Sequence, residues 1–175
     1  MPDNATDIVR KHENALLRYA ARLLGGAEEA GDVVQEAFLR LLKKNHADGG
    51  IDSIDNTRAW LYSVVRNLCG DKFRSAGHRM EVRIDPDGFD KMEGALSAPD
   101  AELAAKEEMR TIRQAINELD PRSREIVILK LEHERSYKEI ARIMDITPTN
   151  VGFILHKAMR KLSEKLKHLE QEGAE

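Results

Sequence analysis

Hydrophobic residues recur every three or four positions through the first part of the chain, with polar residues between them. This period predicts three amphipathic helices, over residues 7–24, about 27–44 and about 57–75. Their apolar faces would pack against one another to form a helical domain. The members are Ile8, Leu16, Tyr19, Ala20, Leu23 and Leu24, then Val33, Val34, Ala37, Phe38, Leu41 and Leu42, then Trp60, Leu61, Val64, Val65, Leu68 and Phe73.

Recognisable end signals bound these helices. Gly25 and Gly26 stop the first helix, and Asn56 or Thr57 caps the start of the third. Residues 45–55 (NHADGGIDSID), which lie between the second and third helices, are rich in Gly, Asp and Ser and predict a loop.

A second helical pattern occupies the C-terminal part of the chain. Asp120 followed by Pro121 is a helix cap with proline at the first helical position. Before this pattern, residues 76–103 lose periodicity and accumulate Gly, Pro, Asp and Ser, which predicts a flexible acidic linker with room for a short helix at its end. The apolar members of the C-terminal pattern are Met109, Ile112, Ile116, Leu119, Ile126, Val127, Leu129 and Leu131.

The sequence contains no useful length of strand alternation and no internal repeat. It therefore predicts an all-α fold of two small helical domains, residues 1–75 and 104–175, joined by the linker. The composition, 41% hydrophobic and 5% aromatic, suits a helical protein better than a sheet protein. No apolar run is long enough to cross a membrane, so we expect a cytoplasmic protein without membrane insertion. The single cysteine, Cys69, lies in an apolar helical pattern and is interpreted as a buried structural thiol.

Charge is distributed unevenly along the chain. Residues 56–79 carry five basic residues and one acidic residue, and residues 121–169 carry eleven basic and six acidic residues. Between them, residues 80–110 carry four basic and nine acidic residues. Two basic segments separated by an acidic one are typical of a chain that contacts nucleic acid at two places.

Residues 136–162 (SYKEIARIMDITPTNVGFILHKAMRKL) have the layout of a helix-turn-helix pair. Ser136 with Glu139 forms a capping box, and Thr147 with Pro148 starts a second helix directly after a short turn. The C-terminal domain is therefore predicted to be a helix-turn-helix (winged-helix-like) DNA-binding domain. The core faces of the two helices are Ile140, Ala141, Ile143 and Met144, then Val151, Leu155, Ala158 and Leu162.

The opposite face of the second helix would enter a major groove. Lys157, Arg160 and Lys161 would lie near phosphates, and the earlier residues of the helix would lie near base edges. The outward face comprises Thr149, Phe153, His156, Lys157 and Arg160, with Asn150 beside it.

Two stretches of the chain together resemble a known family. The run LDPRSREIVILKLEHERSYKEIARIMDITPTNVGFILHKAMRKL resembles the promoter-reading C-terminal domain of bacterial RNA polymerase sigma factors of the small extracytoplasmic-function (ECF) class. In the N-terminal half, AEEAGDVVQEAFLRLLKK and NTRAWLYSVVRNLCGDKFR resemble the polymerase-binding and promoter-melting parts of the same family. The resemblance implies an initiation factor that binds core polymerase, finds minus-10 and minus-35 promoter elements and assists DNA melting.

The resemblance assigns roles to three groups of residues. An outward patch in GDVVQEAF would dock on the clamp helices of the largest polymerase subunit, a basic aromatic helix would bind the minus-10 element, and the helix-turn-helix would read the minus-35 element. These groups are Asp32, Gln35 and Glu36 for polymerase, Arg58, Tyr62, Arg66, Asn67, Lys72 and Arg74 for minus-10 DNA, and Thr149, Asn150, Phe153, His156, Lys157 and Arg160 for minus-35 DNA.

The predicted linker is long enough for both contacts. Its 28 residues span up to about 90 Å when extended, whereas promoter elements two helical turns apart are separated by roughly 70 Å.

Trp60 is interpreted as a core residue in preference to a stacking platform.

The chain departs from the family pattern at Gly152, Phe153 and Ile154, where more polar or basic residues are usual. Phe153 could contact a thymine methyl group in the DNA, or it could pack against a neighbouring protein. The sequence does not decide between these two roles.

The resemblance also implies further partners: the flap of core RNA polymerase, promoter DNA and an inhibitory anti-sigma protein.

The alternative to an initiation factor is a repressor or activator with an N-terminal sensing domain, which would need a dimerisation helix and a ligand pocket. Catalysis, cofactors and metal binding are not expected, because the six histidines are scattered and His133-Glu134 lacks the second histidine of a zinc-protease helix.

Overall fold

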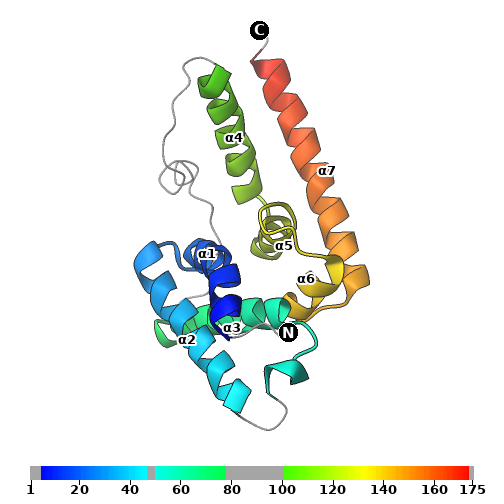
Figure 1. Ribbon diagram of the computed structural model, residues 1–175. Coiled ribbons are helices and arrows are strands. Elements are labelled where there is room, and N and C mark those ends of the chain that lie inside the picture. The colour runs from blue at the N-terminus through cyan, green and yellow to red at the C-terminus, as the bar shows by residue number, and fades with distance from the viewer. Residues whose placement is uncertain (1–4, 47–49, 78–100, 174–175) are drawn as a thin grey trace.

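The computed structural model describes residues 5–46, 50–77 and 101–173, which form helices and no strand (Figure 1). The helices are α1 (Ala5–Leu24), α2 (Ala27–His46), the short 3₁₀ helix η1 (Ile51–Ser53), α3 (Thr57–Ser75), α4 (Ala101–Asn117), α5 (Pro121–Leu131), α6 (Tyr137–Met144) and α7 (Pro148–Glu172). The all-α prediction is confirmed. Most of the linker predicted for 76–103 lies outside the described residues, and α4 begins within its last three positions.

The three N-terminal helices pack around a shared core. Leu16 and Leu23 of α1, Leu41 of α2, and Leu61 and Val65 of α3 are almost completely buried. Trp60 is half-buried and packs against the same core, as the sequence predicted. Cys69 is also fully buried, and burial raises the pKa of its thiol to about 12, which fits a structural role.

The helix ends predicted from the sequence are present with their hydrogen bonds. Asn56 Oδ1 accepts from the Ala59 amide at 2.9 Å, and Asp120 accepts from the Ser123 amide at 3.0 Å. The side chain of Thr147 accepts from the Asn150 amide at 3.2 Å. These caps satisfy amides that have no partner within their own helix, and they fix where α3, α5 and α7 begin.

The helix-turn-helix consists of α6 and α7. Ser136 and Glu139 complete a reciprocal capping box, with side-chain to backbone distances of 3.2 and 3.0 Å. Asp145 ends α6 in the left-handed conformation, with φ of 54°, which Asp adopts more readily than most residues. The eight predicted core positions of the pair are all buried: Ile140, Ala141, Ile143, Met144, Val151, Leu155, Ala158 and Leu162.

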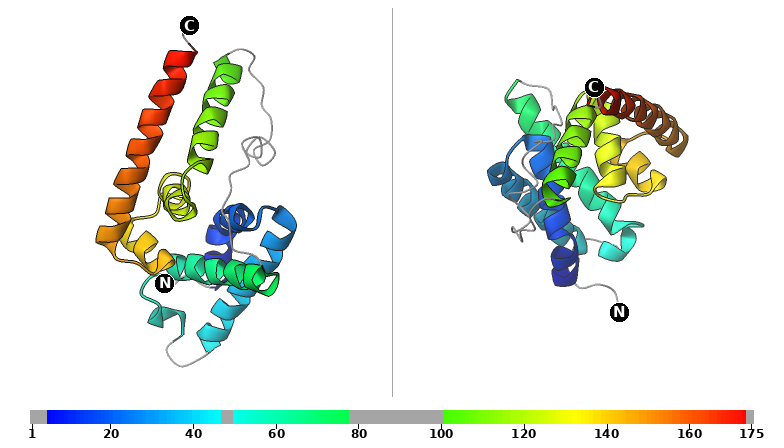
Figure 2. Two further views of the ribbon diagram at one scale, coloured as in Figure 1. Left: turned by 180° about the vertical axis from the view of Figure 1, so that it is seen from behind. Right: turned by 90° about the horizontal axis from the view of Figure 1, so that it is seen from above.

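The C-terminal helices divide into two parts. Helices α4 and α7 run side by side away from α1–α3, and α5 and α6 fill the space near the base of α7 (Figures 1 and 2). Arg124 links α4 to α5 by donating from Nη2 to the carbonyl oxygens of Asn117 and Leu119 at 2.5 and 2.7 Å. Three residues of the predicted apolar patterns are exposed instead of buried: Leu42 of α2, Met109 of α4 and Leu131 of α5.

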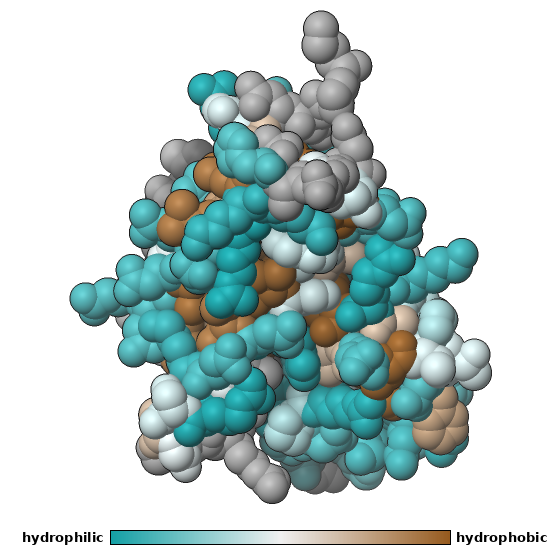
Figure 3. Space-filling view, turned by 90° about the horizontal axis from the view of Figure 1, so that it is seen from below, coloured by the Kyte–Doolittle hydropathy of each residue, from teal (hydrophilic) through white to brown (hydrophobic). Residues whose placement is uncertain are grey.

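The two halves of the chain are in direct contact. Helix α3 lies against α6, and the contact is visible from the front and from behind (Figures 1 and 2). Seen from below, the molecule is mostly hydrophilic, with separate hydrophobic patches between the polar residues (Figure 3). Because α3 contacts α6 directly, this interface sets the relative orientation of the two domains, which the sequence could not give.

Replacing Ser136 by Ala removes one half of the capping box of α6. We expect the free energy of unfolding to fall by about 1 kcal/mol, because the Glu139 amide loses its side-chain acceptor. Urea unfolding followed by circular dichroism measures the change. Ser163→Ala, at an exposed position of α7, serves as the control and should be close to neutral. Equal effects of the two substitutions would contradict the capping role.

Candidate nucleic-acid interface

The outward face of α7 is exposed as predicted. Phe153 is 67% exposed and stands among cationic and polar side chains, whereas the opposite side of the helix is buried in the domain core. The other exposed members of this face are Thr149, His156, Lys157 and Arg160, and Asn150 is partly buried. The structure thus presents the candidate minus-35 residues on one free surface.

Gly152, one of the departures from the family pattern, has a packing explanation. A Cβ atom at this position would lie 3.3 Å from Cε2 of Tyr137, at the start of α6. The Tyr137 ring therefore lies directly against the backbone of α7, and Lys130 lies over the same ring at 5.4 Å from its centroid. The absence of a side chain at 152 allows the two helices to approach closely at this point.

A hollow of about 340 Å³ lies between the start of α5 and the exposed face of α7. Three of its lining residues, Arg122, Lys157 and Lys161, are cationic, and Phe153 lines it as well. Burial raises the pKa of the Asp120 carboxyl in this hollow, but hydrogen bonds from Ser123 outweigh that effect, with a further contribution from Lys161, and the net pKa is lowered. Arg122 at the start of α5 and the two lysines of α7 are suited to binding phosphate groups.

The six candidate minus-10 residues of α3 separate into two sets. Asn67 and Arg74 are exposed and Lys72 is half-buried, and Arg74 pairs with Asp71 of its own helix. The remaining three, Arg58, Tyr62 and Arg66, all contact residues of the C-terminal domain. In this conformation, three of the six candidate minus-10 residues are therefore bound to the protein's own C-terminal domain.

Glu125 of α5 is the most deeply buried charged group in the interface, with 3% of its surface exposed. Tyr19 donates its hydroxyl to Oε1 at 2.7 Å, and Arg66 donates to Oε1 at 2.7 Å and to Oε2 at 3.2 Å. Burial, followed by the charge of Glu125, raises the pKa of Tyr19 well above its ordinary value. The charge of the carboxylate is thus paired with Arg66, and the Tyr19 hydroxyl supplies a further hydrogen bond from the same domain.

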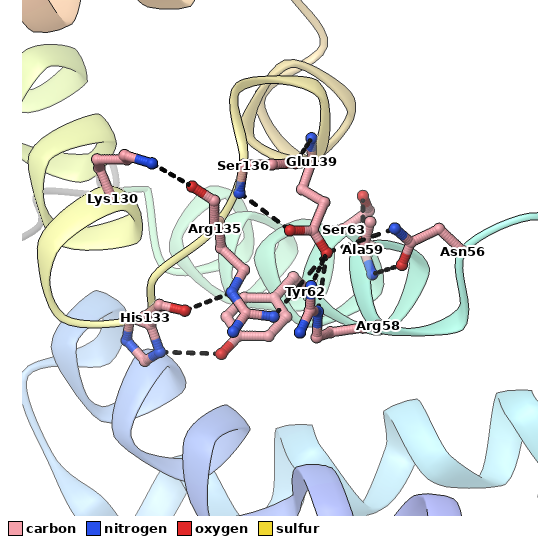
Figure 4. Close-up of polar contacts among 10 residues, drawn as sticks. All are labelled: Asn56, Arg58, Ala59, Tyr62, Ser63, Lys130, His133, Arg135, Ser136 and Glu139. Atoms are coloured by element: carbon pink, nitrogen blue, oxygen red, sulfur yellow. Dashed lines mark hydrogen bonds and ion pairs between the residues drawn. The ribbon is translucent and has the colours of Figure 1, made fainter.

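Glu139 serves both its own helix and the interface (Figure 4). Its Oε2 accepts from the Ser136 amide in the capping box, and its Oε1 accepts from Arg58 Nε at 2.8 Å and from Asn56 Nδ2 at 3.4 Å. Burial raises the pKa of Glu139, but the Ser136 amide and the Arg58 guanidinium outweigh burial and hold it below its usual value. The start of α3 is therefore tied to the start of α6.

An aromatic cluster lies between these two carboxylates. The Tyr62 hydroxyl and Nδ1 of His133 are 2.9 Å apart, and the Tyr19 ring packs against both residues (Figure 4 shows Tyr62 and His133). Arg135 lies over the Tyr62 ring at 5.4 Å from its centroid. Tyr62, interpreted from the sequence as aromatic surface for DNA, is 1% exposed here.

Two more ion pairs lie at the edge of the interface. Arg22 of α1 makes a two-pronged contact with Glu132, with distances of 3.2 and 3.1 Å. Arg142 of α6 donates to Asp55 at 2.9 Å, and both of these side chains are largely exposed. The Arg142–Asp55 pair contributes little to stability, since exposed pairs are screened by water and salt, whereas the Arg22–Glu132 pair is partly buried.

The candidate polymerase patch lies on α2, away from the interface. Asp32 and Gln35 are exposed, and Glu36 accepts from Arg40 one turn further along the helix at 3.0 Å. Within the described residues, α2 packs on α1, α3 and η1. The patch is therefore accessible in this conformation.

Sequence reasoning missed the interface residues Tyr19, Glu125, Glu132, His133 and Glu139. A usable signal existed, since Glu125 stands next to a continuous apolar run and the three glutamates are spaced seven residues apart. In the part of the chain that the structure describes, no group of His, Cys, Asp and Glu side chains is arranged to hold a metal ion. No helix among those residues is long and apolar enough to span a membrane.

Comparison with known proteins identifies both halves of the chain. Residues 8–79 match the family Sigma-70 region 2, and residues 109–162 match Sigma-70, region 4. The ECF RNA polymerase sigma factor SigL of Mycobacterium tuberculosis is 34% identical over 91% of this chain and 86% of its own length. The ECF RNA polymerase sigma factor SigW of Bacillus subtilis is 29% identical over 95% of this chain and 91% of its own length.

Solved structures share the fold. The sigma factor RpoE of Bartonella quintana, in complex with the anti-sigma factor NepR, superimposes with a TM-score of 0.63 at 23% identity, covering 93% of this chain and 96% of that one. CnrH in complex with the cytosolic domain of CnrY gives a TM-score of 0.60 at 22% identity, covering 94% of this chain and 88% of that one.

Acid should weaken the structure through His133. Burial and the nearby Arg18, Arg135 and Arg22 lower its pKa from 6.5 to about 3, so His133 is neutral in the folded protein at neutral pH. The unfolded chain takes up this proton below its pKa of about 6.5, and stability is therefore lost as the pH falls from about 6.5 towards 3.

Between about pH 7.5 and 5.5 we expect His133 to account for about 1.4 kcal/mol of lost unfolding free energy. Urea titrations of the wild type and His133→Gln at both pH values isolate this contribution, because glutamine does not titrate. An identical pH dependence in the two proteins would show that another group is responsible.

Proposed function

Because the chain belongs to the ECF class of RNA polymerase sigma factors, we propose that it recruits core polymerase to specific promoters through separate minus-10 and minus-35 contacts and assists DNA melting. One observation carries this proposal: Sigma-70 region 2 and region 4 match the chain in that order, each on its own helical domain. The family membership makes the protein a transcription initiation factor, and the structure supports a division of labour between its domains.

Core polymerase would bind through α2. Asp32 and Gln35 are exposed there, and Glu36 lies on the same side of the helix, while Val33, Val34 and Ala37 are buried against α1 and α3. A rigid helix with its apolar side fixed in a core presents such a patch in one orientation, which favours docking. The polymerase flap would contact the C-terminal domain.

The minus-10 element would bind along α3. Melted DNA presents unstacked bases and phosphates, which are held by cations and aromatic surfaces. Helix α3 provides both, through Arg58, Arg66, Lys72, Arg74 and Tyr62, with Asn67 as a further polar contact.

The minus-35 element would bind on α7. Lys157, Arg160 and the cationic hollow support contacts to phosphates, and Thr149, Asn150 and His156 supply groups for base edges. Exposed Phe153 would supply an apolar contact to a thymine methyl group. Its surroundings favour DNA as its partner, because the neighbouring exposed side chains are polar or cationic.

The protein would act in the cytoplasm, where core polymerase and the chromosome are found, and without catalysis of its own. The sigma factor RpoE, which shares the fold, was solved in complex with the anti-sigma factor NepR, and we extend this partner class to the present chain.

The docking role of α2 can be tested by reversing one charge. Asp32→Lys should weaken binding to purified core polymerase by roughly tenfold, since an exposed anchoring charge becomes repulsive. Fluorescence anisotropy of the labelled full chain measures this affinity. Glu13→Lys, at an exposed position of α1, is the control with the same charge change and should bind normally. A normal affinity of Asp32→Lys would exclude this patch.

The role of Phe153 can be tested by run-off transcription with core polymerase on genomic fragments. Phe153→Ala should reduce transcription from promoters that need a minus-35 element by roughly tenfold, comparable with the loss of one base contact. Met159→Ala provides the control, since Met159 is also an exposed apolar residue of α7 but lies off the reading face. Loss of core binding by Phe153→Ala would indicate a protein contact instead.

A further inference from the structure

Two of the three residues that depart from the family pattern line the hollow between α5 and α7. Phe153 and Ile154 form part of its wall, at positions where polar or basic residues are usual. Together with Ala158 they give one side of the hollow an apolar surface. This apolar wall therefore distinguishes the hollow from a surface that serves only to attract phosphate groups.

The rest of the lining is polar, and its net charge is positive. Three cations face one carboxylate, and that carboxylate already serves as the N-cap of α5, where Asp120 accepts from the Ser123 amide at 3.0 Å. Because this cap occupies the amide, binding at the hollow depends on side chains and not on the start of the helix. The polar lining residues are Asp120, Arg122, Ser123, Asn150, Lys157 and Lys161.

The three cations of the hollow are free to bind a ligand. Arg122, Lys157 and Lys161 are exposed, and no ion pair within the described part of the chain holds any of them. By contrast, Lys165, one turn beyond Lys161, pairs with Glu118. Lys157 and Lys161 are themselves one turn apart on α7, so their charges lie on neighbouring parts of the same wall.

A nucleotide matches both sides of this hollow. Its phosphate chain suits cations that lie close together, and its base suits the exposed ring of Phe153, since bases stack on aromatic side chains. The amide of Asn150 can donate to and accept from a base edge. The volume of about 340 Å³ falls within the range of sites for small molecules. A bare phosphate group would use the cations and leave the apolar wall uncontacted.

We propose that the hollow binds a purine nucleoside di- or triphosphate, with the base against Phe153 and the phosphates among Arg122, Lys157 and Lys161. Binding at this site goes beyond the proposed function, because it requires neither polymerase nor a promoter.

The site overlaps the candidate minus-35 face. Asn150, Phe153 and Lys157 belong to both, so a bound nucleotide occupies groups that the DNA would need. Nucleotide and minus-35 DNA therefore compete for α7. This consequence, unlike the site itself, rests on the proposed function.

Titration calorimetry of the full chain in magnesium-free buffer tests the site, with ATP and inorganic triphosphate as the two probes. Both carry three phosphates, but only ATP carries a base. ATP should bind at least about tenfold more tightly, because stacking on an aromatic side chain adds to the attraction of the phosphates. Equal affinities, or no binding of ATP, would overturn the proposal.

The apolar wall is tested by Phe153→Ala. This substitution should remove most of the difference between ATP and inorganic triphosphate and leave the affinity for triphosphate unchanged. Met159→Ala is the matched control, since Met159 is also an exposed apolar residue of α7 but does not line the hollow. An ATP preference that survives Phe153→Ala would place the base elsewhere and refute the site.

The phosphate side is tested by Arg122→Gln. Loss of a charge-assisted hydrogen bond should weaken the binding of ATP and of inorganic triphosphate alike, by roughly tenfold. Lys167→Gln removes the same charge from an exposed position of α7 outside the hollow and should have little effect. Equal losses from both variants would mean a general attraction of anions and would refute the site. All these substitutions lie at exposed positions, so the core of the domain is unchanged.

Competition is measured with a fluorescent duplex that carries the minus-35 element of a promoter found by run-off transcription. ATP should displace this duplex from the wild type at lower concentrations than inorganic triphosphate does. If ATP binds with the predicted dependence on Phe153 and Arg122 but leaves the duplex bound, the site stands and its overlap with the minus-35 face is refuted. Failure of the wild type to transcribe from any promoter refutes the proposed function and leaves the nucleotide titrations decisive for the site.

Discussion

The arrangement of this protein depends on a buried carboxylate. Glu125 lies between α5 and the N-terminal domain with almost no contact with water, and an unpaired charge there would be strongly destabilising. Its partners, Tyr19 and Arg66, come from two helices of the other domain, so satisfying the charge fixes the orientation of both domains. The aromatic cluster and the edge ion pairs then fit around this junction.

The position of α7, the second helix of the helix-turn-helix, is set within the C-terminal domain. Its position follows from local chemistry: a capping box starts α6, a left-handed Asp145 ends it, and Thr147 with Pro148 starts α7 directly afterwards. The close approach of Tyr137 to Gly152 sets the two helices against each other. Phe153 consequently stands exposed on a helix whose packing partners all belong to the C-terminal domain.

The sequence by itself determined the helices, their caps, the buried faces of α1, α2, α3, α6 and α7, and the exposed face of α7. Each follows from periodicity or from hydrogen bonds between residues three or four apart, which act within one helix. It also placed both halves in one family. The sequence did not show that Tyr62 is buried, that Arg58 and Arg66 are paired, or that Glu125 and His133 hold them. Each of these contacts links two residues that are separated by between 59 and 106 positions in the sequence. Only the tertiary structure could bring them together, because no local pattern records which distant charge will pair with a buried one.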